Sequence, residues 1–243
     1  MNRKRNIDKI EIFIVVLVML SVVVAISGMS FARYTTSGKG TPSHARVAKW
    51  GIVIDVDASN MFAATADGPM DAILTPGADG LSVVSADVSV LPNTEGALNF
   101  RISGTAEVVA RISFMIPDDL EIVCLKNAEG EIVYSPILWS LTKNEEEVLT
   151  KGDLAALKAT LAESIVEANE ELDDSYTLKW EWPFERGADE QEKAVNNQYD
   201  TMLAKYKADP QENPLPEGYS AVLDFCFNMT IDVSQIQNFE TTE

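Results

Sequence analysis

Few of the residue types that carry enzyme chemistry occur in this 243-residue chain, which has one histidine, His44, and two cysteines, Cys124 and Cys226. A zinc protease needs several ligands and a positioned base, commonly arranged as HExxH, and that motif is absent from the sequence. A nucleophilic triad also needs a histidine. Only His44 could serve, and it follows Pro42 in a polar stretch expected to be a solvated loop. The sequence therefore predicts no enzyme activity, no metal site and no cofactor.

The two cysteines leave two alternatives open. A disulfide between Cys124 and Cys226 would close a loop of about 100 residues, worth roughly 4 to 5 kcal/mol in the chain-entropy model. It requires that the two residues are neighbours in an oxidising compartment. The other alternative is a pair of unbridged thiols packed as small apolar groups.

Acidic clusters are the next groups that could bind a ligand, in this case calcium. The candidates are the runs NEEEV and EANEELDD and the separate residues Asp55, Asp57 and Asp71. The two runs lack the alternating Asp or Asn with a glycine that a calcium-binding loop uses. We expect the acidic residues to form solvated faces.

Three tryptophans, Trp139, Trp180 and Trp182, could form a flat platform for a sugar. Aromatic rings suit that role when they are exposed. In the segment YTLKWEWPF, however, Trp180 and Trp182 share one face of a predicted strand with Leu178. Core packing is therefore the favoured interpretation, and a carbohydrate platform is the alternative.

The charge balance excludes nucleic acid as a partner. The chain has 38 acidic and 19 basic residues and a formal net charge of −19. Binding to phosphates depends on Lys and Arg side chains that displace counterions, and so acidic a surface repels them. The same balance suits a soluble exported protein.

The N-terminal segment predicts export. Residues 12–32 carry no charge, follow the basic cluster NRKR and end in the small-x-small triplet SFA. This order is typical of a signal peptide, 1–32, cleaved between Ala32 and Arg33. The run is also long enough to span a bilayer, so a retained anchor is the alternative. Either way the remainder lies outside the cytoplasm, and membrane contact is limited to residues 12–32.

Residues 33–46 are predicted to be a flexible leader, because they are polar and contain two glycines and a proline. Residues 47–243 are predicted to form one domain. Its first strand is ARVAKWGIVIDVD, with one face made by Ala48, Trp50, Ile52, Ile54 and Val56. Its last strand extends from Ala221 to Ser234, with Phe225, Phe227, Met229, Ile231 and Val233 among the inward residues.

Two helices are expected to interrupt the strands. One lies near 153–168, where Asp153 is a plausible N-cap and Leu154, Leu157, Leu161 and Ile165 recur at helical spacing. The other lies near 190–207 and ends before Pro210. Short strands with turns between them, and helices only as insertions, predict a mainly β fold: an antiparallel two-sheet sandwich with two helical insertions, plus an N-terminal hydrophobic helix.

With the elements in this order, the chain resembles the TasA/camelysin family of Gram-positive exported proteins. The likeness rests on MSFARYTT at the end of the signal, on SADVSVLPNTEGALNFRISGTAEVVARISF, and on YTLKWEWPFE and YDTMLAKY before the terminal TIDVSQIQ. Asn93 stands where the family usually has glycine. The resemblance implies cleavage by a signal peptidase of the SipW type and a jelly-roll-like sandwich at the cell surface or in a biofilm matrix.

In some family members the segment freed by cleavage adds as a strand to the next subunit of a fibre. The resemblance places that donor at 33–45 here, beginning with Arg33, Tyr34, Thr35, Thr36 and Ser37. The expected function is thus that of a secreted or cell-surface structural protein whose partners are further copies or related surface subunits. The alternatives are a monomeric module that binds a carbohydrate or cation and, suggested by the protease label of some camelysin-type members, a secreted protease.

Overall fold

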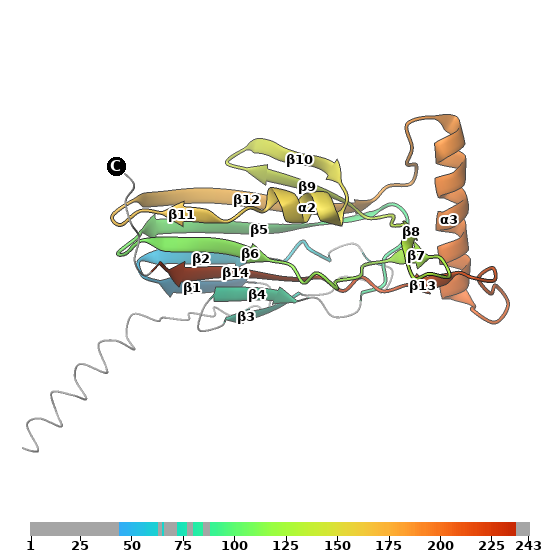
Figure 1. Cartoon of the computed structure of the whole chain (residues 1–243), viewed down its shortest axis with the longest axis horizontal. Helices are drawn as coiled ribbons and strands as arrows, with labels where there is room; N and C mark the ends of the chain where they lie inside the picture. The colour runs from blue at the N-terminus through green and yellow to red at the C-terminus, as the bar shows by residue number, and fades with distance from the viewer. Residues whose placement is uncertain (1–43, 63–64, 66–71, 77–79, 85–87, 237–243) are drawn as a thin grey trace, which may run out of the picture. The chain divides into compact units, whose positions relative to one another are not determined.

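Alternating apolar residues form antiparallel sheets throughout the described part of the chain. The computed structural model describes residues 44–62, 65, 72–76, 80–84 and 88–236. All of them belong to the second of two units into which the chain divides, residues 36–243. Every strand pairing recorded among them is antiparallel (Figure 1). The predicted mainly β, antiparallel fold is confirmed.

The larger sheet has six strands in the order β1-β2-β5-β12-β9-β10. Its two longest strands, β5 and β12, pair over their whole length, with Thr94 opposite Trp182 and Glu171 opposite Thr105. The bounds of the six strands are β1 His44–Lys49, β2 Ile52–Asp57, β5 Thr94–Thr105, β12 Glu171–Trp182, β9 Leu138–Lys143 and β10 Glu146–Gly152.

Two smaller sheets accompany it. A five-stranded sheet has the order β11-β6-β14-β4-β3, with β11 Ser164–Val166, β6 Ala110–Met115, β14 Asn228–Gln235, β4 Gly80–Val84 and β3 Ile73–Pro76. A three-stranded sheet has the order β13-β7-β8, with β13 Ser220–Val222, β7 Cys124–Lys126 and β8 Ile132–Tyr134.

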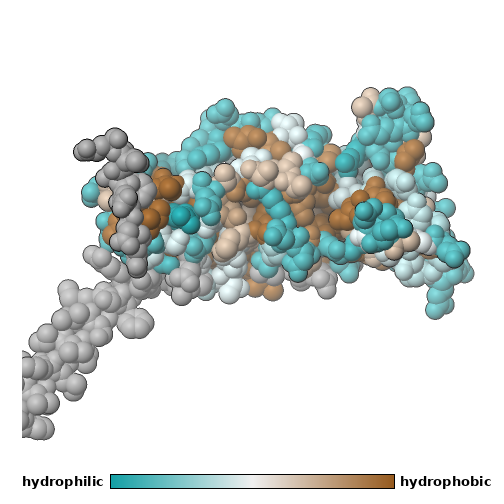
Figure 2. Space-filling view, viewed as in Figure 1, coloured by the Kyte–Doolittle hydropathy of each residue, from teal (hydrophilic) through white to brown (hydrophobic). Residues whose placement is uncertain are grey.

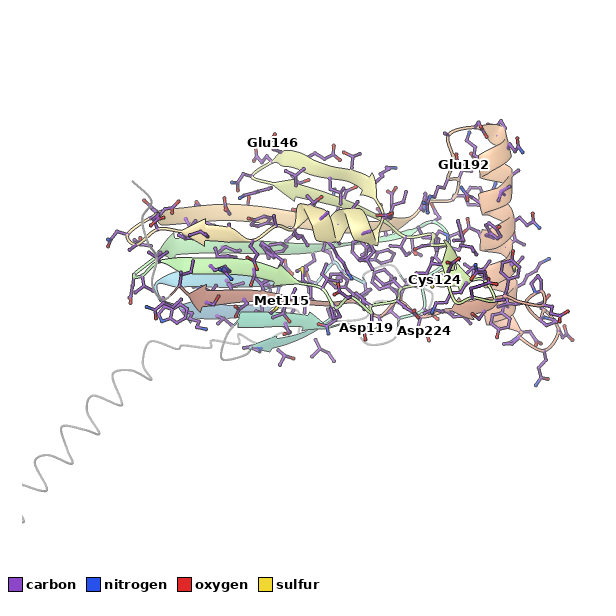
Figure 3. All side chains as sticks on the ribbon, viewed as in Figure 1. Met115, Asp119, Cys124, Glu146, Glu192 and Asp224 are labelled. Atoms are coloured by element: carbon purple, nitrogen blue, oxygen red, sulfur yellow. The ribbon has the colours of Figure 1, made fainter. Side chains whose placement is uncertain are left out.

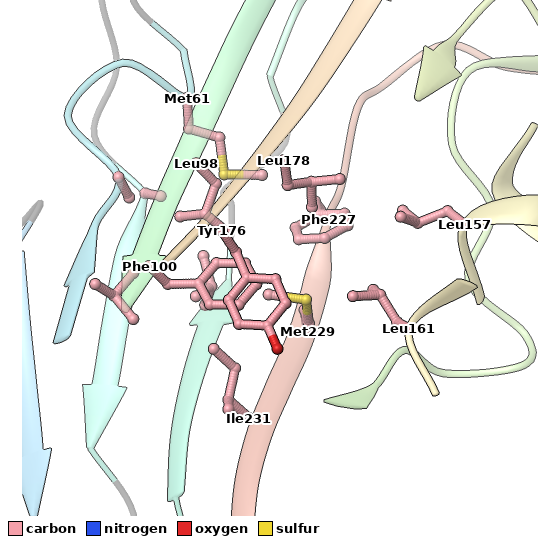
Figure 4. Close-up of a cluster of buried hydrophobic side chains, with 14 of the residues drawn as sticks. Met61, Leu98, Phe100, Leu157, Leu161, Tyr176, Leu178, Phe227, Met229 and Ile231 are labelled. Atoms are coloured by element: carbon pink, nitrogen blue, oxygen red, sulfur yellow. The ribbon is translucent and has the colours of Figure 1, made fainter. Parts of the chain in front are cut away.

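The core lies between the six-stranded and five-stranded sheets. Phe100 and Leu98 of β5 and Tyr176 and Leu178 of β12 face Met229 and Ile231 of β14, together with Phe227 just before it (Figure 4). Aromatic rings join the layers: the ring centroid of Phe114, in β6, lies 5.8 Å from that of Phe100 and 5.7 Å from that of Tyr176. The inward residues predicted for the YTLKWEWPF strand, and the five predicted from Phe225 to Val233, are all buried.

Helix α2 is shorter than predicted and spans Leu154–Thr160. Asp153 is its N-cap, as predicted, and its side chain accepts a hydrogen bond from the Ala156 N–H at 2.7 Å. Leu157 and, just after the helix, Leu161 are buried and point into the core (Figure 4). Ile165 was expected on the same stripe, but it lies in strand β11 and is 53% exposed. That part of the helix prediction is wrong.

Helix α3 spans Glu190–Ala208, close to the prediction, with Asp189 as its N-cap. Figure 1 shows it across the ends of the strands, beside β7, β8 and β13. Its buried residues are Leu203 and Asp200.

Two predicted strands are each divided in the structure. The first is a hairpin of β1 and β2, because Trp50 and Gly51 adopt positive φ angles of 48° and 81° and reverse the chain. Lys49, expected on the outer face, is therefore 6% exposed, and its ammonium lies 4.4 Å from the centre of the Trp50 ring. The last predicted strand is β13 followed by β14, which belong to different sheets.

Candidate functional site

The edges of the two large sheets are the first candidate for function, because an edge strand presents unpaired backbone groups that a second chain can satisfy. In the six-stranded sheet the edges are β1 and β10, and in the five-stranded sheet they are β11 and β3. These four edges differ in how well they are protected.

Strand β10 is protected against a partner. Glu146 and Glu147 are exposed, and the pairing with β9 shifts register twice along the strand. Figure 3 shows the Glu146 side chain projecting away from the sheet. Charged side chains and bulges on an edge oppose the addition of another strand. The predicted solvated face of the NEEEV run is confirmed here.

The edges of the five-stranded sheet lack this protection and carry apolar side chains. Ile73 of β3 is 55% exposed and Ile165 of β11 is 53% exposed. Beyond β3 and β11 no further strand is recorded in the described ranges. The face seen in Figure 2 has apolar areas interrupted by hydrophilic ones. Neither strand carries a charged residue or a register shift, so we call these two short strands the open edges of the sandwich, although β3 also contains Pro76 and contacts β1.

Strand β1 is the edge at which the predicted leader enters the domain. It begins at His44, so the last three residues of the predicted leader, 44–46, belong to the sheet. His44 and Ala45 pair with Asp57 and Val56 of the same chain, which excludes them from a donor segment. The rest of the predicted donor, including Arg33, Tyr34, Thr35, Thr36 and Ser37, lies outside the described residues, as does the predicted cleavage between Ala32 and Arg33.

His44 has a structural partner. Its Nε2 lies 3.3 Å from Oδ1 of Asp57, and both side chains are partly exposed. Asp55, the other strand aspartate considered for calcium, lies directly opposite Arg101 in the ladder, and Arg101 pairs with Asp173 at 2.6 Å. Within the described residues no group of three or more His, Cys, Asp or Glu side chains could hold a metal ion. Asp71 lies outside those residues.

The three tryptophans considered for sugar binding are buried, with exposed fractions of 1% for Trp139, 1% for Trp180 and 3% for Trp182. Their interpretation as core residues is confirmed, and a platform made from them is excluded. Two of them also donate hydrogen bonds. Trp180 Nε1 donates to the Met61 carbonyl at 2.8 Å, and Trp182 Nε1 donates to Oδ1 of Asp200 at 2.8 Å.

The candidate disulfide is not formed in the structure, where Cys124 and Cys226 are not bridged. Cys124 is fully buried in β7, opposite Val222 of β13. Burial raises the pKa of its thiol, because the charged thiolate loses its hydration there. Of the two alternatives, the structure has the unbridged thiols.

Asp200 is the polar residue that sequence reasoning missed. Its carboxylate is buried beneath α3, and Oδ1 accepts hydrogen bonds from the Tyr134 hydroxyl at 2.7 Å and from the Trp182 indole. Desolvation raises the pKa of Asp200, while the two hydrogen bonds and the nearby Arg186 act in the opposite direction. One signal was available: Asp200 precedes Leu203 by three residues and so shares the buried face of the helix.

Neither helix in the described part of the chain has the length and apolar character needed to cross a bilayer. Comparisons with models of protein families, with curated proteins and with solved structures find no match to this chain.

Proposed function

We propose that this protein is an exported structural subunit of the cell surface or extracellular matrix, built as a jelly-roll-like sandwich. Its N-terminal hydrophobic helix, in residues 1–32, is a signal that a peptidase of the SipW type removes between Ala32 and Arg33. The leader that this cleavage frees adds as a strand to an open sheet edge of the next copy. The resemblance to the TasA/camelysin family motivates this proposal.

The observation that carries it is that the leader enters the domain at an edge strand. Residues 33–43 precede β1 directly, and β1 is the outermost strand of its sheet. An extended segment rises about 3.3 Å per residue, so 11 residues reach about 36 Å. That length exceeds the span of β3 or β11, which have 4 and 3 residues.

Charge supports an acceptor on another copy. Residues 33–43 contain Arg33 and Lys39 and no acidic residue, whereas the chain as a whole carries −19. Opposite charges favour the encounter between this basic leader and an acidic neighbour, and this attraction weakens as salt is added. The five-stranded sheet supplies the acceptor because its edges lack the charges and bulges that protect β10.

The first test compares protein beginning at Arg33 with protein beginning at His44, by sedimentation velocity and electron microscopy at rising concentration. We expect assembly only when the leader is present, and weaker assembly at high salt. Circular dichroism controls for folding. If the longer protein stays monomeric, strand addition is wrong. Mass spectrometry of the exported protein tests the cleavage site, and any first residue other than Arg33 contradicts it.

A second test locates the acceptor edge. Ile165→Lys and Ile73→Lys each place a charge on an open edge, and Val148→Lys is the matched control on β10, where Val148 is 43% exposed. We expect one of the two open-edge variants to prevent assembly and the control to leave it unchanged. Assembly that withstands both open-edge variants but fails in the control would reverse the assignment of the edges.

A further inference from the structure

A hollow of about 360 Å³ lies beside α3, and it belongs to neither sheet edge. Helix α3 forms one wall of the hollow. The segments just before β5 and just after β12 form the other wall. The polar and apolar groups that line it come from Asn197, Asp200, Thr201 and Lys205 of α3 and from Pro92 and Phe184.

The carboxylate of Asp200 is held rigidly at this hollow. Both of its hydrogen-bond donors, the Tyr134 hydroxyl and the Trp182 indole, contact the same oxygen, Oδ1. Tyr134 is 6% exposed and Trp182 is 3% exposed, so the donors are fixed in the core. No donor among the described residues contacts Oδ2. One carboxylate oxygen is therefore left to accept from a molecule in the hollow.

An aromatic ring lines the same hollow. Phe184 is 71% exposed, the highest value among the large apolar side chains of the described residues. It comes two residues after the end of β12, and its ring is open to solvent. An exposed aromatic face is suited to the apolar face of a ligand, because stacking then removes both faces from water.

The remaining polar side chains of the hollow have no hydrogen-bond partner among the described residues. The side chains of Asn197, Thr201 and Lys205 make no hydrogen bond or ion pair with any other described residue. Together with Asp200 they offer one anionic acceptor, one cationic donor and two neutral groups that both donate and accept.

This combination selects a class of ligand. A free anion would be repelled by Asp200, and a small cation by Lys205. A wholly apolar ligand would displace water from Oδ2 of Asp200 and from the Lys205 ammonium without replacing the lost hydrogen bonds. A sugar ring satisfies the set, since its hydroxyls donate to Oδ2 and accept from Lys205 and Asn197, while its C–H face covers Phe184. The volume lies at the lower end of the roughly 300–1,000 Å³ of small-molecule pockets, which suits one or two rings.

We propose that the hollow between α3 and Phe184 is a binding site for a neutral pyranose sugar, such as a unit of a surface polysaccharide. The site is independent of strand addition, since it uses neither the leader nor an edge strand. It also differs from the platform of buried tryptophans that the sequence suggested.

The test follows the indole N–H of Trp182 by NMR, because that group is bonded to Asp200 and its signal is identified by its loss in Trp182→Phe. The full chain is used in a zwitterionic detergent without a sugar headgroup. The probes are glucose, galactose, mannose, N-acetylglucosamine and its β-1,4-linked disaccharide, each added up to about 50 mM, because single-sugar affinities near 1 mM correspond to only about 4 kcal/mol. Methylammonium chloride and phosphate are the ionic controls.

We expect at least one sugar to shift the Trp182 signal in a saturable way. Phe184→Ala should weaken the binding of that sugar about fivefold or more, because stacking is lost. Asp200→Asn should also weaken its binding, because an amide NH₂ replaces the accepting Oδ2. Val195→Ala, an exposed apolar position of α3 outside the hollow, is the matched control and should bind as the natural protein does.

Three outcomes would overturn the proposal. The first is that none of the sugars shifts the signal, and the second is that methylammonium or phosphate does so instead. The third is that Phe184→Ala binds as tightly as the Val195→Ala control. Because Phe184 is mostly exposed, its variant is expected to fold normally, so lost binding cannot be attributed to unfolding.

Discussion

Gly96 is a position where one added methyl group should damage the core. It lies in β5 directly opposite Trp180 of β12, at the point where the Trp180 indole crosses to donate to the Met61 carbonyl. A Cβ at Gly96 would lie 2.0 Å from that carbonyl oxygen and 2.6 Å from the indole nitrogen. Gly96→Ala therefore cannot be accommodated without breaking the hydrogen bond.

The expected cost has two parts. The broken bond leaves a buried N–H and a buried C=O without partners, at about 1–3 kcal/mol. Displacing the Trp180 ring, which is 1% exposed and packs on Phe225 with centroids 4.7 Å apart, adds about 1–3 kcal/mol of overpacking. Replacing glycine by alanine also stabilises the strand by about 0.5–1 kcal/mol, because alanine loses less backbone entropy on folding. The net loss of unfolding free energy is then about 1–5.5 kcal/mol, with a middle value of about 3 kcal/mol.

Urea unfolding followed by tryptophan fluorescence measures this loss. Gly130→Ala is the control, because a Cβ there meets nothing within 4 Å and its cost, about 1 kcal/mol, comes only from the positive φ of 82°. In a Trp180→Phe background the penalty at Gly96 should shrink by about 1 kcal/mol or more, since the same hydrogen bond is already gone. The reasoning is refuted if Gly96→Ala costs no more than Gly130→Ala and the Trp180 indole N–H remains protected from exchange.

The remaining predictions concern three other sites. Because burial raises the pKa of Asp200, its contribution to stability is full below the ordinary pKa of 3.8 and is lost as the pH rises through the folded-state pKa. The stability of Asp200→Asn relative to the natural protein should therefore rise as the pH is raised from about 3 to 7. Urea unfolding of both proteins at the two pH values measures this difference, and a fall in place of a rise would contradict the prediction. Leu157→Ala should cost about 2–5 kcal/mol, and Ile165→Ala, at 53% exposure, less than about 1 kcal/mol; equal losses would contradict the assigned end of α2. A thiol reagent should find two reactive cysteines after unfolding, whereas native Cys124 should react slowly because it is buried and its pKa is raised. Fewer than two reactive thiols after unfolding would contradict the absence of a disulfide.

Strict alternation was the most reliable signal in this sequence. From Tyr176 to Trp182 and from Phe225 to Val233 each predicted inward residue is buried. The reason is that a period of two places the same residues on one face whatever the sheet pairs with. The order in which the strands pair could not be predicted in this way, because no residue within β12 indicates that its neighbours are β5 and β9.

The hairpin of β1 and β2 shows where alternation misleads. Trp50 and Gly51 form a two-residue turn, but Trp-Gly is not among the Asn-Gly and Asp-Gly pairs that announce such turns. Read as one strand, the segment retains its period while the turn changes which face each residue occupies. The inward assignment of Ile52, Ile54 and Val56 therefore holds, whereas Lys49 is buried against expectation.

The end of α2 was ambiguous for a different reason. Leucines at 154, 157 and 161 fit a helix, and Ile165 extends the same spacing by one more turn. A short apolar run fits helix and strand equally well, and here the backbone of β6 was available to pair with residues 164–166. Asp200 was missed because its donors, Tyr134 and Trp182, come from distant parts of the chain, which no local pattern connects.

The pairing of β5 with β12 sets the order in which this chain can fold. Residues 106–170 lie between the two strands, so the middle of the larger sheet closes only after Trp182 has been made. Hairpins such as β1–β2 and β9–β10 need only local contacts and should form first, while the distant pairings make the overall folding rate slow. The five-stranded sheet can be completed only later, because its strand β14 lies near the C-terminus. A chain that emerges from a membrane pore N-terminus first would thus hold separate hairpins, and not a closed sandwich, until its final strand is through.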